Sequence, residues 1–474
     1  RPRVFWKGRL KIPAQVMPEQ DPQVRIHNWD EVYLPLDMDT AKTEATRCIQ
    51  CTAAPCIEAC PLSNDIPAAL WLLENGDVQG AARKFRETSN LPDVCGRLCP
   101  QERLCEGYCV VGKNAKPVAI GRLETFVSDY LRNEVGYQVP ELPPSTGKRV
   151  VVVGSGPSGL AAAEELALKG HSMTVFDAWP QPGGLLLYGI PSFAMAKGLL
   201  YQKLDYLRKL GIEFICNTYI GKEVTVDDLL EGSPWGKFDA VFLGHGAGVG
   251  VELRVPGEDL PGIFTAADYL ARGNLAPELL PESLREPLPA ARRVSVIGGG
   301  DTAMECVRTA VRRGAETVTC VYRRTEPEMP GRTDERVHAR EENVQFCFLA
   351  ASLEFFAGED GRVARMKCQR MELGEPDESG RRRPVPIPGS EFILETDMVI
   401  KALGHGADRA VAASATNVET ERWGGIVIDR ERGATSRPGI FAGGDAVNGA
   451  DLVVTALRGG RIAAKGIHQY LTGK

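Results

Sequence analysis

Eight cysteines near the start of the chain fall into two closely spaced runs, and each run contains a Cys-Pro step. The spacing is C-x2-C-x4-C-x3-C-P in the first run and C-x3-C-P-x4-C-x3-C in the second. Thiolates are ligands of structural zinc and of iron–sulfur clusters, so eight of them suffice for two four-ligand sites. The first run is Cys48, Cys51, Cys56 and Cys60, and the second is Cys95, Cys99, Cys105 and Cys109.

Three kinds of site compete for these thiols. Disulfides are disfavoured because the thirteen cysteines are an odd number and the first thirty residues lack an apolar signal region. Zinc usually takes C-x2-4-C pairs across a longer loop, and only Cys48/Cys51 and Cys95/Cys99 approach that spacing. Runs with a Cys-Pro step are typical of bacterial ferredoxins, in which the fourth cysteine ligates the other cluster. Iron–sulfur is therefore favoured, and zinc stays open.

The ferredoxin analogy also predicts that the two runs exchange ligands. The last cysteine of each run would leave its neighbours and complete the site of the other run. The first site would then hold Cys48, Cys51, Cys56 and Cys109, and the second Cys60, Cys95, Cys99 and Cys105. The other five cysteines lie alone in apolar or helical contexts and are predicted to be buried small hydrophobes; they are Cys216, Cys306, Cys320, Cys347 and Cys368.

Length and composition are those of an ordinary globular protein. The chain has 474 residues, 43% hydrophobic and 25% charged, which predicts about three domains. A net charge of −6 gives no basic field for nucleic acid, and no apolar run approaches the roughly twenty residues of a membrane helix. Many cysteines without a secretion signal indicate a reducing compartment, so we expect a cytoplasmic protein.

The pattern of predicted secondary structure changes at Lys148. Residues 1–147 alternate short helical patterns, at 68–73, 80–85 and 120–131, with loops that carry Pro and Cys. Beyond a turn-rich linker, strands alternate with helices, the βαβ pattern of a parallel sheet. This pattern occurs twice, at 150–153, 160–169 and 172–177, and again at 293–297, 302–313 and 317–322.

The first βαβ unit carries a dinucleotide fingerprint, G-x-G-x-x-G, between its strand and its helix. Gly154 allows the tight turn, Gly156 lets the backbone approach a pyrophosphate, and Gly159 lets the helix pack on the strand. Asp177 ends the next strand, where a carboxylate should accept hydrogen bonds from ribose hydroxyls.

A distant segment favours FAD over NAD at this site. Residues 435–445 resemble the second FAD motif of two-dinucleotide-binding flavoproteins, in which the aspartate, here Asp445, binds flavin ribityl or phosphate groups. A helix is predicted at 452–464. The loop 183–191, with Gly184 and Leu185, fits a segment lying against the flavin ring; an ordinary Gly-Pro turn is the alternative.

The second unit carries G-x-G-x-x-A, again between strand and helix. Its candidate nucleotide-binding residues are Gly298, Gly300, Asp301, Thr302 and Ala303. The following strand ends in Arg323 and Arg324 where the first unit has an aspartate, and two guanidinium groups suit the 2′-phosphate of NADPH. Arg332 is a third, weaker candidate. Two exposed arginines that merely end a strand are the alternative.

Together these segments resemble the small (beta) subunit of bacterial NADPH-dependent glutamate synthase, and the same module occurs in dihydropyrimidine dehydrogenase. The resemblance implies an NADPH-dependent oxidoreductase with FAD and two [4Fe-4S] clusters. It further implies a separate large subunit that carries FMN and makes glutamate from 2-oxoglutarate and glutamine, in a hetero-oligomer. Alternatives are a ferredoxin-linked NADPH oxidoreductase, the electron-input subunit of another dehydrogenase, or a zinc-bearing assembly module.

The resemblance adds a rival for one cluster ligand. In the dehydrogenase, one cluster takes a glutamine from the helix that follows the cysteines, and the similar position here is Glu124. We favour Cys95 as the fourth ligand because a thiolate is the commoner choice.

The order of the motifs predicts the fold. We expect an α/β protein with two Rossmann-like domains, arranged as in disulfide reductases and preceded by a helical iron–sulfur domain. The expected boundaries are 1–147 for the iron–sulfur domain, 148–250 and 406–474 for the FAD domain, and 251–405 for the NADPH domain inserted in it.

Overall fold

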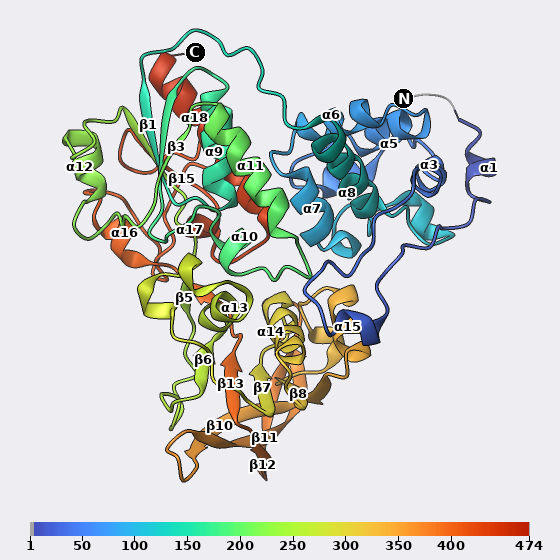
Figure 1. Cartoon of the computed structure of the whole chain (residues 1–474), viewed down its shortest axis with the longest axis vertical. Coiled ribbons are helices and arrows are strands. Elements are labelled where there is room, and N and C mark those ends of the chain that lie inside the picture. Colours follow the sequence, from blue (N-terminus) through green and yellow to red (C-terminus); the bar gives the residue numbers. More distant parts are fainter. Residues whose placement is uncertain (1–3, 474) are drawn as a thin grey trace.

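The computed structural model describes residues 4–473 and forms one helical and two α/β parts (Figure 1). Aspartates begin four of the amino-terminal helices; the Asp37 side chain, for instance, accepts a 2.8 Å hydrogen bond from the Thr40 N–H. The elements of this part are α1 (Trp6–Arg9), α2 (Pro22–Arg25), α3 (Met38–Thr46), α4 (Pro55–Ala59), α5 (Ile66–Glu74), α6 (Val78–Arg86), α7 (Pro92–Leu98), η1 (Gln101–Arg103), η2 (Val110–Lys113), α8 (Ile120–Tyr130) and η3 (Leu131–Val135).

The first α/β part is built on a five-stranded parallel sheet in the order β15-β4-β1-β2-β3. The chain leaves this sheet after β4 and returns to it with β15. Its elements are β1 (Arg149–Val153), α9 (Pro157–Ala167), β2 (Ser172–Phe176), α10 (Leu185–Tyr188), α11 (Lys197–Lys209), β3 (Glu213–Ile215), α12 (Val226–Glu231), β4 (Ala240–Leu243), α16 (Arg409–Ala413), β15 (Ile440–Ala442), α17 (Asp445–Asn448) and α18 (Val453–Thr472).

The valine run of β1 serves both faces of this sheet. Val150 and Val152 pack under α9, α11 and α18, whereas Val151 and Val153 pack toward α12, α16 and α17. All four side chains are at most 5% exposed. A continuous apolar run is expected for a parallel strand covered on both sides, because side chains alternate between the two faces.

The second α/β part has its own five-stranded parallel sheet, in the order β6-β13-β7-β8-β9. One face packs against α13 and α14. The elements are β6 (Ile263–Thr265), α13 (Ala266–Asn274), η4 (Pro277–Leu279), η5 (Glu282–Leu284), β7 (Arg293–Ile297), α14 (Asp301–Arg312), β8 (Thr317–Tyr322), η6 (Glu326–Glu328), α15 (Thr333–Glu341), β9 (Gln345–Phe348) and β13 (Met398–Lys401).

An antiparallel sheet that the sequence analysis did not anticipate covers the other face of the second parallel sheet. Its strands are β10 (Ala350–Ala357), β11 (Val363–Pro376) and β12 (Arg382–Glu395). Phe355 and Met366 pack there against Val321 and Val399 of the parallel sheet. A short pair, β5 (Val249–Gly250) with β14 (His405–Gly406), joins the two crossings between the α/β parts.

Three of the five isolated cysteines are buried as expected, but Cys216 and Cys347 are half-buried. Cys347 lies on β9 and Cys216 directly follows β3, and both strands are edges of their sheets. An edge strand has a neighbour on one side only, so its side chains keep some contact with solvent.

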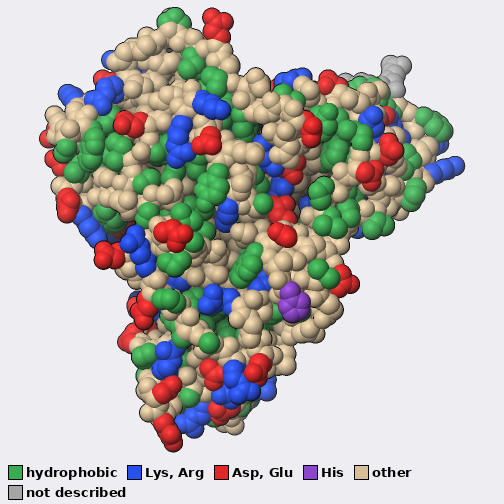
Figure 2. All heavy atoms as spheres, viewed as in Figure 1, with side chains coloured by type: hydrophobic (Ala, Val, Ile, Leu, Met, Phe, Trp, Pro, Cys, Tyr) green, Lys and Arg blue, Asp and Glu red, His purple; other side chains and the backbone are tan. Residues whose placement is uncertain are grey.

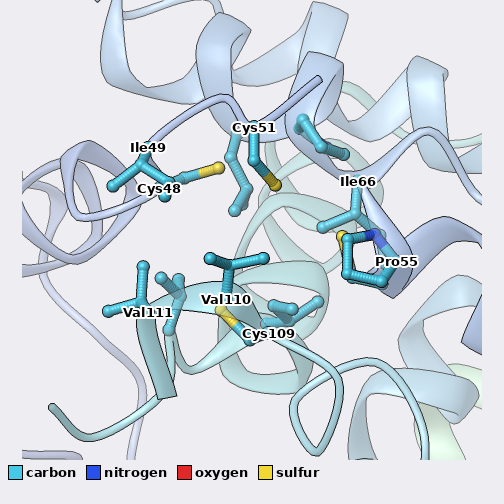
Figure 3. A pocket seen from close by; sticks show the side chains of 13 residues that line it. Cys48, Ile49, Cys51, Pro55, Ile66, Cys109, Val110 and Val111 are labelled. Carbon is cyan, nitrogen blue, oxygen red and sulfur yellow. The ribbon is translucent and has the colours of Figure 1, made fainter. Parts of the chain in front are cut away.

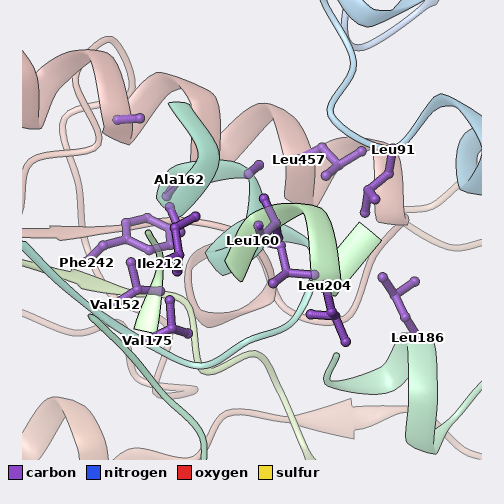
Figure 4. Close-up of a cluster of buried hydrophobic side chains, with 14 of the residues drawn as sticks. Leu91, Val152, Leu160, Ala162, Val175, Leu186, Leu204, Ile212, Phe242 and Leu457 are labelled. Atoms are coloured by element: carbon purple, nitrogen blue, oxygen red, sulfur yellow. The ribbon is translucent and has the colours of Figure 1, made fainter. Parts of the chain in front are cut away.

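The amino-terminal part packs on the first sheet layer through apolar side chains. Leu91, at the start of α7, lies beside Leu457 of α18 in one buried cluster (Figure 4). On the molecular surface, acidic and basic side chains are interspersed over the face shown in Figure 2. Across residues 4–473, the helices are too short or too polar to cross a membrane.

Candidate functional site

Four cysteines line one small cavity in the amino-terminal part. Cys48, Cys51 and Cys56 come from the first run, and Cys109 comes from the second. Figure 3 shows the sulfur atoms of Cys48, Cys51 and Cys109 directed into this space. The structure thus brings together the four cysteines that the ferredoxin analogy assigned to the first site.

The rest of this cavity is aliphatic: its other lining residues are Ile49, Pro55, Ile66, Pro67, Leu70, Val110, Val111, Val118 and Ile120. Burial raises the pKa of Cys48 to about 11 and that of Cys56 to about 12. Thiolates in such a place need a positive group to balance them. The donor set suits an iron–sulfur cluster, which thiolates hold in apolar surroundings.

The other four cysteines form a second group of thiols, between α7 and α8. Cys95 lies on α7, Cys99 follows that helix, and Cys60 and Cys105 come from neighbouring turns. Burial raises the pKa of Cys60 to about 11, with smaller contributions from Glu124 and Cys95. Burial likewise raises the pKa of Cys105, again with Glu124 and Cys60 among the causes. These thiols therefore share one electrostatic environment.

Glu124, the rival ligand, shares the electrostatic environment of this second set. The hydrogen bond between Cys95 and Cys99 raises the pKa of Cys95 and lowers that of Cys99, whereas burial and Glu124 raise the pKa of both. Glu124 thus raises the pKa of all four thiols. Its own pKa is raised to about 8 by burial, and its Oε1 accepts a 3.3 Å hydrogen bond from the Asn64 amide. Cys95 and Glu124 both remain candidates for the fourth ligand.

The distances between the thiols can be compared with those in a tetrahedral zinc site. A tetrahedral zinc with Zn–S bonds of about 2.3 Å would hold its four sulfurs roughly 3.8 Å apart. Among residues 4–473, the one trio of Cys, His, Asp or Glu ligand atoms lying within 4.8 Å of one another is Glu19, His338 and Glu341. No three thiols of either cysteine set meet that criterion among these residues, although Cys95 and Cys99 are hydrogen-bonded to each other.

The first glycine-rich turn follows β1. Gly154 adopts a φ of +100°, and a side chain on Gly159 would collide with the Gly154 carbonyl. By contrast, a Cβ added to Gly156 would meet nothing within 4 Å. The space beside Gly156 lies at the amino-terminal end of α9, where free N–H groups favour a phosphate.

Asp177 stands next to this turn at the end of β2. Its carboxylate accepts hydrogen bonds from the N–H and the hydroxyl of Ser155, and another from the Trp179 N–H at 2.9 Å. Burial raises the pKa of Asp177. The Ser155 hydroxyl also accepts a 2.9 Å hydrogen bond from the Gly183 N–H. Sequence reasoning missed Ser155, which occupies a variable position of the fingerprint and gave no signal.

Two distant segments meet the same turn. A Cβ on Gly184 would lie 2.8 Å from the Gly156 Cα, so the loop at 183–191 runs directly along the turn, with Leu185 44% exposed beside it. A Cβ on Gly444 would lie 2.7 Å from the Ser158 hydroxyl, which places the adjacent Asp445 near the start of α9. Burial raises the pKa of Asp445 to about 6, with Asp451 as a smaller cause.

Lys197 is a second residue that sequence reasoning missed. Its ammonium group donates hydrogen bonds to the Leu186 carbonyl, at 2.8 Å, and to the Ile190 carbonyl. It therefore holds two positions of the loop beside the first turn. Burial lowers the pKa of Lys197 to about 7.

The second glycine-rich turn follows β7. Gly298 adopts a φ of +143°, and a Cβ on Gly300 would meet only the Pro330 ring, at 3.9 Å. Asp301 and Thr302 form the half-buried first turn of α14, and Ala303 is fully buried beneath it. The turn thus keeps open space at the amino-terminal end of a helix, as the first turn does.

The three candidate arginines differ in their surroundings. Arg323 is exposed and has no side-chain partner among residues 4–473. Arg324 is buried, and its guanidinium donates 2.7 Å and 2.6 Å hydrogen bonds to the Arg382 carbonyl and to Asp377. Arg332 is directed toward the amino-terminal part, where it donates a 2.8 Å hydrogen bond to the Arg97 carbonyl. Arg323 is the one best placed for an incoming 2′-phosphate.

Comparisons with known proteins match both halves of this arrangement. Residues 25–135 match the family described as dihydropyrimidine dehydrogenase domain II, 4Fe-4S cluster. Residues 148–460 match the pyridine nucleotide-disulphide oxidoreductase family. The small chain of glutamate synthase [NADPH] from Escherichia coli is 40% identical over 461 residues, which cover 96% of each chain. The chain belongs to the glutamate synthase small-chain family.

Relatives with other names match the chain as well. The putative oxidoreductase AegA from Escherichia coli is 43% identical over 457 residues, which cover 95% of this chain and 68% of AegA. Among solved structures, Mycobacterium tuberculosis FprA in complex with NADPH has a TM-score of 0.58 at 20% identity, covering 70% of this chain and 85% of FprA. The α/β fold predicted from the sequence is thereby confirmed, and the protein is an oxidoreductase of this family.

Proposed function

We propose that this protein is the electron-input subunit of a glutamate synthase. In this proposal it oxidises NADPH at FAD and passes the electrons through two [4Fe-4S] clusters to a large subunit. That large subunit carries FMN and makes L-glutamate from 2-oxoglutarate and L-glutamine. The near full-length similarity to glutamate synthase small chains supports this assignment. The cytoplasm, as a reducing compartment, is the proposed location.

One structural observation carries the proposal: the second cysteine set lies next to the first α/β part, and the first cysteine set lies beyond it. Cys95 belongs to the same buried cluster as Leu160 of α9 and Leu457 of α18, and Cys60 and Cys99 pack against that cluster. Cys56 belongs to a separate core within the amino-terminal part. The second set therefore lies between the nucleotide-binding sheet and the first set, as an electron relay toward a partner requires.

The nucleotide-binding residues have defined tasks in this proposal. The open turn at Gly156 would take the FAD pyrophosphate, Asp177 a ribose, and Asp445 the ribityl or phosphate groups, while Gly184 and Leu185 would lie along the flavin. The second turn, Gly298 to Ala303, would take NADPH. When bound, flavin and clusters together supply the conversion of a two-electron donor into one-electron transfers.

The protein itself contributes position and exclusion of water. Lys197 fixes the loop beside the first turn, and aliphatic side chains shield the first thiol set. Sheet connectivity supports the proposed division of labour: residues 148–250 and 406–474 would form the FAD domain, and residues 251–405 the NADPH domain. The amino-terminal residues up to 147 would form the cluster domain.

A second candidate function is electron input to a different oxidoreductase. It is favoured by the 43% identity to AegA, which is longer than this chain and is not named a glutamate synthase. In that case the nucleotide and cluster sites would work in the same way, but the electron acceptor would differ.

Reconstitution separates the two candidates. The protein is combined with a glutamate synthase large subunit, and NADPH-dependent formation of glutamate is measured; the protein alone with an artificial dye serves as the control. We expect dye reduction by the protein alone and glutamate formation only in the mixture. Dye reduction without glutamate formation in a verified complex would favour the second candidate.

A further inference from the structure

A short segment, Pro330–Asp334, lies between the second glycine-rich turn and the second cysteine set. On the nucleotide side, the Gly331 N–H donates a 3.1 Å hydrogen bond to the Gly299 carbonyl, and the Arg332 N–H donates a 2.8 Å hydrogen bond to Asp301. A Cβ on Gly331 would sit 3.1 Å from the Gly299 oxygen. The segment is therefore packed directly on the turn that we assign to NADPH.

The other side of the same segment holds the chain around Cys99. The Arg332 guanidinium donates a 2.8 Å hydrogen bond to the carbonyl of Arg97, which precedes Cys99 on α7. The Thr333 N–H donates a 3.1 Å hydrogen bond to the carboxylate of Glu102, which follows Cys99 in η1. Two consecutive residues of the segment thus bind the backbone and a side chain on either side of one cysteine.

The charges around Arg332 make this bridge stiff. Its side chain is 11% exposed and forms ion pairs with Asp301 at 3.5 Å and with Glu335 at 3.3 Å. Arg97 is held in turn by Glu31 and Asp129, each at 2.7 Å. A buried charge cannot move from its partners without a large cost, so a change at Asp301 is passed to Arg332 rather than absorbed by solvent.

We propose that this segment couples nucleotide occupancy of the second turn to the redox site that contains Cys99, with Arg332 as the positioning residue. The inference rests on the proposed function, because it takes NADPH at the second turn and a cluster at the second cysteine set. A phosphate at the start of α14 adds negative charge beside Asp301, which changes the balance of charge on Arg332. Hydrogen bonds and charges around a cluster set its reduction potential.

Nucleotide binding and cluster reduction are thermodynamically linked, so the coupling can be measured as a change in either the nucleotide affinity or the reduction potential. If the nucleotide binds the oxidised and reduced forms with different affinities, its binding shifts the potential by the corresponding amount. A tenfold difference in affinity equals about 59 mV for a one-electron couple.

The experiment uses the whole protein and 2′-phospho-ADP-ribose, which keeps the phosphates of NADPH but has no nicotinamide to exchange electrons. Cluster potentials are measured by redox titration with EPR detection, with and without the analogue, and its affinity for the oxidised protein is measured by calorimetry. We expect one cluster to shift by an amount equivalent to about tenfold in affinity. The other cluster should shift much less.

Two substitutions and a matched control test the role of Arg332. Arg332→Ala should abolish the shift while the oxidised protein still binds the analogue, and Arg332→Lys should restore part of it. Tyr33→Phe removes a 2.7 Å hydrogen bond from the amino-terminal part to Asp334 in the same segment, but not the contacts around Cys99. This control should keep the full shift. Circular dichroism and flavin content confirm that each variant is folded.

The outcomes distinguish failure of the proposed nucleotide site from failure of the proposed coupling. Failure of the wild-type protein to bind the analogue would contradict the proposed nucleotide site itself. Binding without a shift, a full shift in Arg332→Ala, or loss of analogue binding by Arg332→Ala would overturn the coupling role. If Arg332→Ala does not fold, hydrogen exchange on the wild type decides: the analogue should change protection at residues 95–102, and unchanged protection there would overturn the inference.

Discussion

Cys109 faces Cys48 across a single small cavity, although the two residues belong to different cysteine runs (Figure 3). This relationship means that neither run closes a four-thiol site by itself. In the ligand grouping that we propose, each run supplies one thiol to the site of the other. Loss of the last cysteine of either run should therefore damage the site of the other run.

The grouping of ligands predicts which substitutions are equivalent. Cys109→Ala and Cys48→Ala should each remove the same cluster signal from the EPR spectrum, because both thiols line the first cavity. Cys60→Ala should remove the other signal. Iron content is measured in parallel to show that one cluster is retained in each variant. If Cys109→Ala lost the same signal as Cys60→Ala, the grouping would be wrong.

A second prediction concerns the fourth ligand of the second set. Because a thiolate is the commoner cluster ligand, and because Glu124 raises the pKa of all four thiols, we expect Cys95→Ser to damage this cluster more than Glu124→Ala does. The readout is the EPR line shape and the potential of the second cluster, with the first cluster as internal standard. A normal second cluster in Cys95→Ser, together with its loss in Glu124→Ala, would assign the fourth ligand to Glu124.

Nucleotide choice gives a third prediction. Arg323→Ala should raise the KM for NADPH by roughly ten- to a hundredfold and leave that for NADH nearly unchanged, since a charge-assisted contact contributes about 1.5–3 kcal/mol. Arg324→Ala should instead lower stability, because it removes the partner of Asp377. Steady-state kinetics with both nucleotides and a thermal unfolding curve separate the two effects. Equal changes in both KM values for Arg323→Ala would show that this residue does not select the 2′-phosphate.

Two neighbouring histidines, His171 before β2 and His468 on α18, predict a loss of stability in mild acid. The His171 Nε2 lies 2.9 Å from the His468 Nδ1, and the other ring nitrogen of His171 lies 2.8 Å from the Thr146 hydroxyl. Burial lowers the pKa of both imidazoles, and Lys169 lowers both further. The unfolded chain, with a histidine pKa near about 6.5, then binds more protons than the folded one, so stability falls as the pH drops below that value.

The measurement for this pair is the urea unfolding midpoint at pH 7.5 and at pH 5.5. The wild-type midpoint should fall more over this interval than that of His468→Gln, which lacks one of the two titrating rings. Parallel decreases in the two proteins would show that other groups cause the acid sensitivity.

Local patterns predicted the parallel sheets well. Four consecutive valines before Gly154 predicted β1. A strand pattern in the same place before Gly298 predicted β7. The helix predicted at 452–464 extends in fact to Thr472 as α18. Gly466 suggests an end to that helix, but it is needed because the Arg432 backbone packs against it, leaving no room for a side chain.

The antiparallel sheet and the bridge at Arg332 were beyond sequence reasoning. β12 contains Pro384, Pro386 and Pro388, and prolines argue against a strand unless it is an edge, which β12 is. Arg332 was predicted only as a third, weaker candidate for the 2′-phosphate. Its contact with Arg97 depends on how the amino-terminal part docks, and no local pattern encodes that.

Metal and acid-labile sulfide analysis of the protein purified without oxygen tests the central claim most directly. The account predicts about eight iron and eight sulfide per chain, as two four-iron clusters require. Loss of about half of both in Cys48→Ala would tie them to the cysteine sets. Zinc bound without sulfide would contradict the account, because the cysteine sets could then carry no electrons from the nucleotide sites.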